Sequence, residues 1–175
     1  MRRLTPADYT RQPWKNGKGE TVELARMDRD GALLWRLSMA TVAEDGPFSV
    51  FPGVERNLTV LDGPGFRLVG DGIDLPCLPL SPVAFPGDVA VQAIQTGGAV
   101  STDFNVMTAR TLPLPQVDVV TDARNLPVAD LSAIFALSPA TVNGHPIARH
   151  DLVLSETPCH VATEGAVIVV RLSLR

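Results

Sequence analysis

Prolines and glycines interrupt this chain so often that only short regular elements fit between them. The 175 residues include 15 prolines and 14 glycines, and turn-forming pairs such as Asn143-Gly144 separate apolar runs. Runs with strand character occupy residues 21–25, 33–40, 57–61, 65–69, 89–94, 102–107, 117–120, 133–137, 152–154 and 166–174. Many short strands at this spacing predict a sandwich, a jelly roll or a barrel. We expect helix at most for a turn or two, within residues 123–132.

A weak internal repeat divides the chain into two halves. Asp88 and Asp151 each fall just before a new apolar strand, and the proline-rich segment 112–116, LPLPQ, has the character of an extended linker. The sequence therefore predicts an all-β protein of two jelly-roll or barrel halves, packed in one compact unit. The expected halves are residues 1–112, which carry the ligand site, and the smaller 113–175. An exchange of strands between the halves stays open.

Composition and charge restrict the classes of partner. The net charge is −4, and no cluster of lysine and arginine is present, which argues against nucleic acid as a partner. No apolar run approaches the roughly 20 residues that span a bilayer, and the N-terminus lacks the apolar region of a signal peptide. Cys77 and Cys159 form no CxxC pair, which is typical of reduced thiols in the cytoplasm. We expect a cytoplasmic protein without a membrane partner.

The segment FSVFPGVERNLTVLDG, residues 48–63, resembles the first metal-binding motif of cupins, G-x5-H-x-H-x3/4-E-x6-G, without its ligands. With Gly63 as the closing glycine, Arg56 stands at the glutamate position, and Phe51 and Ser49 stand at the two histidine positions. In the second motif, PxG-x2-H-x3-N, Ala90 replaces the histidine. This set of side chains does not suit a transition metal. We therefore expect no metal and no cofactor, and a cavity in which an arginine replaces the cation.

Several further blocks together make the resemblance more specific. They are residues 13–23, 35–40, 45–53, 56, 85–88 and 103–107. In combination they resemble the HutD/Ves family of the cupin superfamily. One departure is Lys18, where the family more often has a glycine, and we do not expect it to change the fold. The resemblance implies a bicupin fold, an association with bacterial histidine utilisation, absent metal ligands and no established enzymatic activity.

Arg56 is the first candidate for a ligand contact. A guanidinium is always charged and offers a fork of donors that suits a carboxylate. Inside a barrel it needs an anionic partner, because an unpaired buried charge is costly. We predict that this partner is a ligand; the alternative is a structural ion pair with Glu23, Glu55 or Asp103.

A strand face with polar residues supplies two further candidates. Alternation along residues 33–40 places Arg36 and Ser38 opposite Trp35, Leu37 and Met39. If the polar face lines the cavity, Arg36 and Ser38 add a second contact to an anion. The same alternation also fits a solvated face of a sheet.

The remaining candidates come from a loop and a later strand. Lys15 and Asn16 belong to the glycine-rich segment KNGKG, whose backbone N–H groups suit an anion nest, although a plain loop fits as well. Asn105 carries an amide that both donates and accepts, for a ligand or for a cross-strand hydrogen bond. With Ser49 and Phe51 these residues complete the predicted ligand site.

Catalytic signatures are weak in this sequence, and we assign no catalytic residue. His145, His150 and His160 all lie in the second half, where a metal site is not favoured, and no serine lies in a G-x-S-x-G elbow. Our main hypothesis is a metal-free bicupin that binds a small carboxylate metabolite of histidine degradation, such as formyl-glutamate or urocanate. Its expected role is to regulate or moderate the flux of that pathway.

Two other classes of function and the oligomeric state stay open. A metal-independent cupin isomerase or epimerase needs a general base, for which Glu23 or Asp103 is the visible substitute. A module that binds a protein partner and no ligand is the third class. A homodimer is compatible with each of the three.

Overall fold

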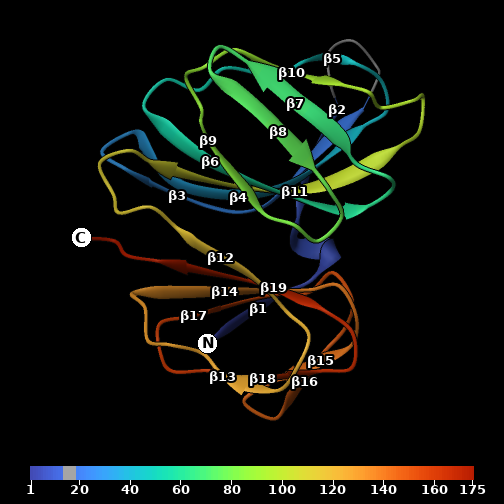
Figure 1. Ribbon diagram of the computed structural model, residues 1–175. Coiled ribbons are helices and arrows are strands. Elements are labelled where there is room, and N and C mark those ends of the chain that lie inside the picture. The colour runs from blue at the N-terminus through green and yellow to red at the C-terminus, as the bar shows by residue number, and fades with distance from the viewer. Residues whose placement is uncertain (14–18) are drawn as a thin grey trace. The chain divides into compact units, whose positions relative to one another are not determined.

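The computed structural model describes residues 1–13 and 19–175, which form two compact units built almost entirely of antiparallel strands (Figure 1). One unit is Thr10–Thr111, and the other combines Met1–Tyr9 with Leu112–Arg175. The 3-10 helix η1 (Pro6–Asp8) interrupts the strands near the N-terminus. The predicted all-β class is confirmed.

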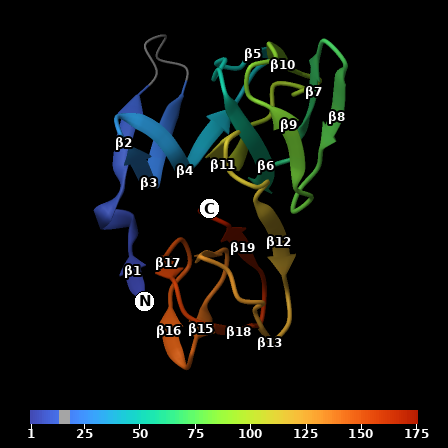
Figure 2. The same ribbon diagram turned by 90° about the vertical axis from the view of Figure 1, so that its left-hand side faces the viewer.

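Two sheets form the unit Thr10–Thr111. The larger one has six strands in the order β2 (Thr10–Pro13), β3 (Glu20–Arg29), β4 (Ala32–Val42), β11 (Ser101–Ala109), β6 (Val54–Asp62) and β9 (Val83–Pro86). The smaller one has the order β5 (Gly46–Pro47), β10 (Val91–Ile94), β7 (Phe66–Gly70) and β8 (Ile73–Cys77). Figure 2 shows the strands of the smaller sheet beside those of the larger one. A shared core of buried side chains joins them, from Leu58 and Val60 in β6 to Leu68 in β7 and Ala93 in β10.

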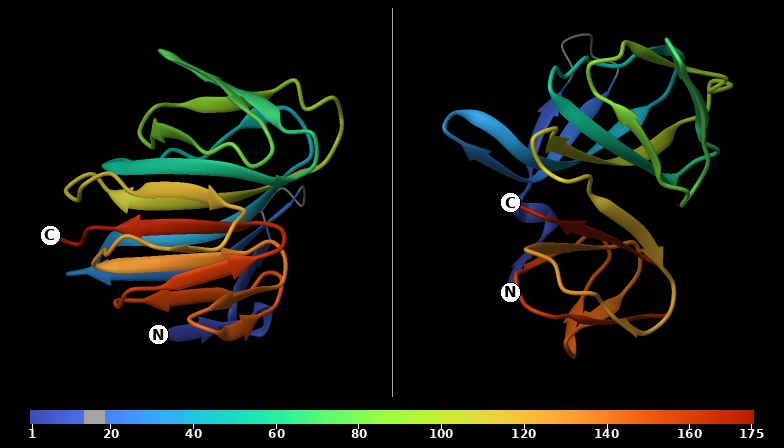
Figure 3. Two further views of the ribbon diagram at one scale, coloured as in Figure 1. Left: turned by 60° about the horizontal axis from the view of Figure 1, so that its bottom comes forward. Right: turned by 60° about the vertical axis from the view of Figure 1, so that its left-hand side comes forward.

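The second unit also has two sheets, which Figure 3 shows from two further sides. Its five-stranded sheet has the order β1 (Arg2–Leu4), β17 (Leu152–Ser155), β14 (Leu131–Ala136), β19 (Val167–Leu172) and β12 (Gln116–Val120). Its four-stranded sheet has the order β13 (Arg124–Asn125), β18 (His160–Thr163), β15 (Ala140–Val142) and β16 (His145–Ile147).

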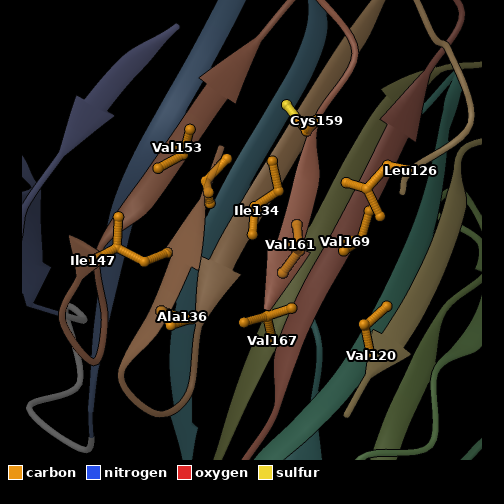
Figure 4. Close-up of a cluster of buried hydrophobic side chains, with 12 residues drawn as sticks. Val120, Leu126, Ile134, Ala136, Ile147, Val153, Cys159, Val161, Val167 and Val169 are labelled. Atoms are coloured by element: carbon orange, nitrogen blue, oxygen red, sulfur yellow. The ribbon is translucent and has the colours of Figure 1, made fainter. Parts of the chain in front are cut away.

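The core of the second unit is a cluster of aliphatic side chains from both sheets (Figure 4). Ile134 in β14 and Val169 in β19 belong to it together with Val161 in β18, and each of them is almost completely buried. Removing this apolar surface from water stabilises the unit, at roughly 25 cal/mol for each Å².

Each of the ten predicted runs overlaps a strand, because each alternates or runs apolar between turn residues. The Asn143-Gly144 turn lies between β15 and β16, with φ of 51° and 79° at its two residues. Positive φ at both positions is what a tight hairpin with an Asn-Gly turn requires. The turn prediction at this position is confirmed.

The helical turn expected within residues 123–132 is wrong. Arg124 and Asn125 form β13 and pair with Val161 and His160 of β18, and the next backbone N–H, that of Leu126, donates to Cys159 O at 2.8 Å. The side chain of Leu126 is buried in the aliphatic core. Cross-strand pairing therefore satisfies the backbone groups that a helix would have paired locally.

The structure groups the N-terminus differently from the expected halves 1–112 and 113–175. Residues Met1–Tyr9 belong with the C-terminal residues, because β1 pairs with β17 in the five-stranded sheet. Arg3 forms an ion pair of 2.6 Å with the buried Asp151, and the Tyr9 hydroxyl donates to His150 O at 2.6 Å. These contacts fix the segment that precedes β2.

Candidate functional site

The unit Thr10–Thr111 contains a cavity of about 360 Å³. Strands β3, β4, β6 and β11 and the segment after β4 supply its lining, which consists of Thr21, Arg36, Ser38, Ala40, Val42, Pro47, Phe48, Ser49, Phe51, Arg56, Asp103, Asn105 and Met107. Six of the eight predicted site residues are among them. The other two, Lys15 and Asn16, lie outside the described residues.

Strand register brings the polar side chains together. Asn105 of β11 pairs with Ser38 of β4, and Met107 lies between Arg36 of β4 and Arg56 of β6. Side chains on a strand alternate between the two faces, so these residues project from the same face of the sheet. The face of β4 with Arg36 and Ser38 thus lines the cavity, and Ser38 is buried.

Among the described residues that line the cavity, Arg56 is the more deeply buried of the two arginines, with only 6% of its surface exposed. Its Nη2 donates to Asn105 Oδ1 at 2.6 Å, and its Nη1 donates to the backbone oxygen of Ser49 at 3.4 Å. Its guanidinium lies 5.4, 5.4 and 5.0 Å from the ring centres of Phe48, Phe51 and Phe85. Cation–π attraction to three rings stabilises the charge in this position.

Two of the three carboxylates proposed as structural partners of Arg56 pair with other arginines. Glu23 pairs with Arg36 Nε at 2.7 Å, and Glu55 pairs with Arg110 at 2.6 Å. Within the described part of the chain, Arg56 has no carboxylate oxygen within 4 Å. Burial lowers the pKa of Arg56 to about 10, and the neighbouring Arg36 lowers it further against the opposing effect of Asp103. The guanidinium therefore stays charged at neutral pH.

Asp103 is completely buried in the wall of the cavity. Its Oδ1 accepts a short hydrogen bond from Asn105 Nδ2, and its Oδ2 has no hydrogen-bond partner among the described residues. Burial raises the pKa of Asp103 to about 7, although the charge of Arg56 and the hydrogen bond from Asn105 both oppose the rise. A carboxyl group with this pKa changes its charge near neutral pH.

Asn105 connects the cation to the buried carboxyl group. Its amide oxygen accepts from Arg56, and its amide nitrogen donates to Asp103. The cross-strand hydrogen bond considered for Asn105 is therefore present. This bridge was not evident from the sequence, although the i, i+2 spacing of the two residues placed them on one face of a strand. Phe48 and Phe85, which flank Arg56, were also missed, because aromatic residues in a β-rich chain are usual in cores.

The cavity does not offer the donors of a cupin metal centre. Its lining has two guanidinium groups and a single carboxyl group, and Ala90, at the fourth approximate ligand position, lines a different, shallow hollow with Val69 and Gln92. Across residues 1–13 and 19–175, no three histidine, cysteine, aspartate or glutamate side chains are grouped so as to hold a metal ion. The buried charge of Arg56 also repels a cation, so the described residues of the lining do not fit a transition metal.

The antiparallel sheets of the two units have the arrangement of cupin-fold proteins. The fold matches a cupin 2 conserved barrel domain protein from Leptotrichia buccalis with a TM-score of 0.57 and 7% identity, over 87% of this chain and 88% of that one. The predicted cupin fold is confirmed.

The family is shown more specifically by the sequence. The HutD family model matches residues 6–169, and the chain belongs to the HutD family. It is 45% identical over 109 residues to a Pseudomonas putida protein described as an uncharacterized 21.2 kDa protein in the hutC 3′ region. That match spans 61% of this chain and 57% of the relative. The predicted membership is confirmed.

Two solved structures agree over nearly the whole chain. HutD from Pseudomonas fluorescens SBW25, solved in a formate condition, has a TM-score of 0.88 and 30% identity, over 99% of this chain and 98% of that one. A conserved protein of unknown function from Pseudomonas aeruginosa PAO1 has a TM-score of 0.85 and 32% identity, over 98% of both chains. No helix in the described residues is long and apolar enough to cross a membrane.

Proposed function

We propose that this protein binds a small carboxylate metabolite of histidine degradation, such as formyl-glutamate or urocanate, without a metal. In this proposal the bound metabolite regulates or moderates flux through histidine utilisation. The observation that carries it is the buried Arg56 guanidinium, which lines a cavity and has no carboxylate within 4 Å in the described part of the chain.

The size and charge of the cavity support a small anion. Its volume of about 360 Å³ is near the lower end of the range for small-molecule pockets, roughly 300–1,000 Å³. Arg36 and Arg56 both line it, while the Asp103 carboxyl group is protonated in a large fraction of molecules at neutral pH. A carboxylate that enters this cavity meets the buried charge of Arg56, since Arg36 is paired with Glu23, and charge-assisted hydrogen bonds to such a guanidinium are strong.

The link to histidine degradation rests on the family and on the relative from the hutC region. It supports the pathway as the source of the ligand and does not name the ligand. Burial favours binding over catalysis, because Asp103, whose pKa is raised to about 7, is fully buried in the wall of the cavity and its Oδ2 is closed to solvent. An isomerase or epimerase base must reach a substrate proton.

A thermal-shift screen tests the proposal. We would compare urocanate, formyl-glutamate, formimino-glutamate, glutamate and histidine, with glutamine as the neutral-side-chain match for glutamate. A ligand that binds only the folded state stabilises it by about 2.7 kcal/mol at a concentration of 100 Kd. We expect at least one acidic metabolite to raise the melting temperature in proportion to the logarithm of its concentration. If none of them does so, small carboxylates are not the ligands.

A further inference from the structure

We propose that carboxylate binding at Arg56 is coupled to the uptake of a proton by Asp103, so that the affinity of the cavity for anions falls as the pH rises. This inference rests on the proposed function, since it concerns the same cavity, and it adds how the site responds to its surroundings. It is carried by the hydrogen-bonded chain Arg56–Asn105–Asp103.

The chain joins one fixed cation to one buried carboxyl group through a neutral amide. Arg56 donates to Asn105 and Asn105 donates to Asp103, so the carboxyl group has a single neutral donor on Oδ1. Its Oδ2 is buried and has no partner among the described residues. An ionised carboxylate in such a place is costly, because one amide hydrogen bond does not replace the water that it has lost.

The charges that act on Asp103 come from the strands around it. Its neighbours in register are Ala40 of β4 and Val60 of β6, which are uncharged. Arg56 of β6 favours its ionised form, whereas Cys77 of β8 stays a neutral thiol because burial, with Asp103 nearby, raises its pKa to about 12.

The charged side chains that β3 and β4 place near Arg56 offset each other. Arg36 of β4 is next to Arg56 and is paired with Glu23 of β3. Among the described residues, Arg56 is therefore the charge that favours the ionised form of Asp103.

A ligand carboxylate that pairs with Arg56 removes the stabilisation that the guanidinium gives to the ionised form of Asp103. The negative charge of the ligand offsets the field of the guanidinium at Asp103, and the ionised carboxyl group then lies in a buried site without a counter-charge. A proton from bulk solvent binds Oδ2 and neutralises it, while the ligand stays an anion. Because burial already brings the pKa of Asp103 to about 7, a modest further rise changes its charge at physiological pH.

Calorimetric titration with N-formyl-L-glutamate tests this coupling. The probe has two carboxyl groups of ordinary pKa, near 4, and no group that titrates near neutral pH. At about pH 8 we would titrate it in two buffers that differ in their heat of ionisation. We expect the observed enthalpy to differ between the buffers by the heat of up to about one proton for each ligand, and Kd to rise by up to about tenfold for each pH unit.

Asp103→Asn tests whether Asp103 is the group that takes up the proton. The asparagine retains an oxygen that accepts from Asn105 and has no titrating group, so we expect it to bind the probe without any dependence on the buffer. Asp74→Asn is the matched control, because Asp74 is paired with Arg67 in the β7–β8 hairpin and does not line the cavity. We expect this control to behave as the wild type.

The outcomes separate the coupling from the proposed function. If the wild type binds the probe with the same enthalpy in both buffers, or if Asp103→Asn still takes up a proton, the coupling is wrong although the site binds carboxylates. If the wild type does not bind the probe at any pH, N-formyl-L-glutamate is not the ligand and the coupling is wrong for it, whereas the proposed function fails only if every carboxylate of the thermal-shift screen fails as well. The carbon NMR signal of the Asp103 carboxyl group gives the same result without a variant: we expect its titration to move to higher pH when the probe is added.

Discussion

Arg56 and Asn105 form a hydrogen bond of 2.6 Å that fixes the orientation of the Asn105 amide. The amide oxygen faces the guanidinium, so the amide nitrogen faces the carboxyl group of Asp103. The reverse orientation would place a donor against a donor and an acceptor against an acceptor. One neutral side chain therefore keeps a cation and a buried acid in a defined relationship.

Asn105→Leu removes this link and keeps the branched shape of the side chain. It leaves Arg56 without its 2.6 Å acceptor and Asp103 without its donor, and a buried polar group that loses its partner costs about 1–3 kcal/mol, more if charged. We expect the free energy of unfolding at neutral pH to fall by about 2–5 kcal/mol, measured by urea denaturation. Asn125→Leu, on the exposed strand β13, is the control and should have little effect. A loss below about 1 kcal/mol in Asn105→Leu would show that water replaces the lost hydrogen bonds.

Arg56→Ala should abolish most of the carboxylate binding. Removal of one partner of a buried charge pair costs on the order of 2–5 kcal/mol, which is roughly a thirty-fold to several-thousand-fold loss of affinity. Arg56→Lys keeps the charge but loses the fork, so it should also lose much of the affinity. Calorimetry with the best ligand of the thermal screen measures both, with Arg67→Ala, in an exposed pair outside the cavity, as the control. Unchanged affinity in Arg56→Ala would mean that Arg56 only supports the three phenylalanine rings.

Asp103 should make the stability of the wild type depend on pH. Its pKa is raised from 3.8 to about 7 in the folded state, so the folded state binds the proton more tightly than the unfolded state does. The proton bound to Asp103 contributes its full stabilisation below about pH 4, and this stabilisation is lost as the pH rises towards about 7. Relative to Asp103→Asn, the wild type should lose up to about 1.4 kcal/mol for each pH unit in this window. Urea denaturation at four pH values would measure the slope, and a flat difference would mean that the carboxyl group is solvated.

Ile134 is central to the aliphatic core of the second unit, where it is completely buried. Ile134→Ala leaves a cavity among closely packed side chains and should lower the free energy of unfolding by about 2–5 kcal/mol, whereas Ile134→Val should cost about 0.5–1.5 kcal/mol. Denaturant unfolding of the two variants measures the loss of unfolding free energy in each and therefore the ratio of the two losses. Equal losses would indicate that the neighbouring side chains collapse into the space.

The strands and part of the site were predictable because they depend on local pattern. Alternation along β4 separated Arg36 and Ser38 from Trp35 and Leu37, and the structure keeps this separation. Arg56 was found from its place relative to a closing glycine, and it is buried in the cavity as an inward-facing strand residue should be. These signals are contained in a few neighbouring residues.

The features that were missed depend on residues far apart in the chain. Phe85 lies on β9 and contacts Arg56 only because β9 pairs with β6. Residues 124–125 form a strand because β18, more than 30 positions later, supplies the pairing partner. The grouping of the N-terminus with the C-terminal residues likewise depends on β17. Neither composition nor periodicity specifies such distant partners.

The pairing of β1 with β17 has a consequence for the order in which the protein can fold during synthesis. Arg3 faces Val153 in register, so 150 residues separate them in the chain. Translation at about 5–20 residues per second produces β17 roughly 8–30 seconds after β1. The whole unit Thr10–Thr111 is translated in that interval, during which β1 does not yet have its partner strand β17. The protein therefore has a kinetic interval in which one end of the nascent chain is free for a chaperone or a neighbouring chain, and slower translation would lengthen it.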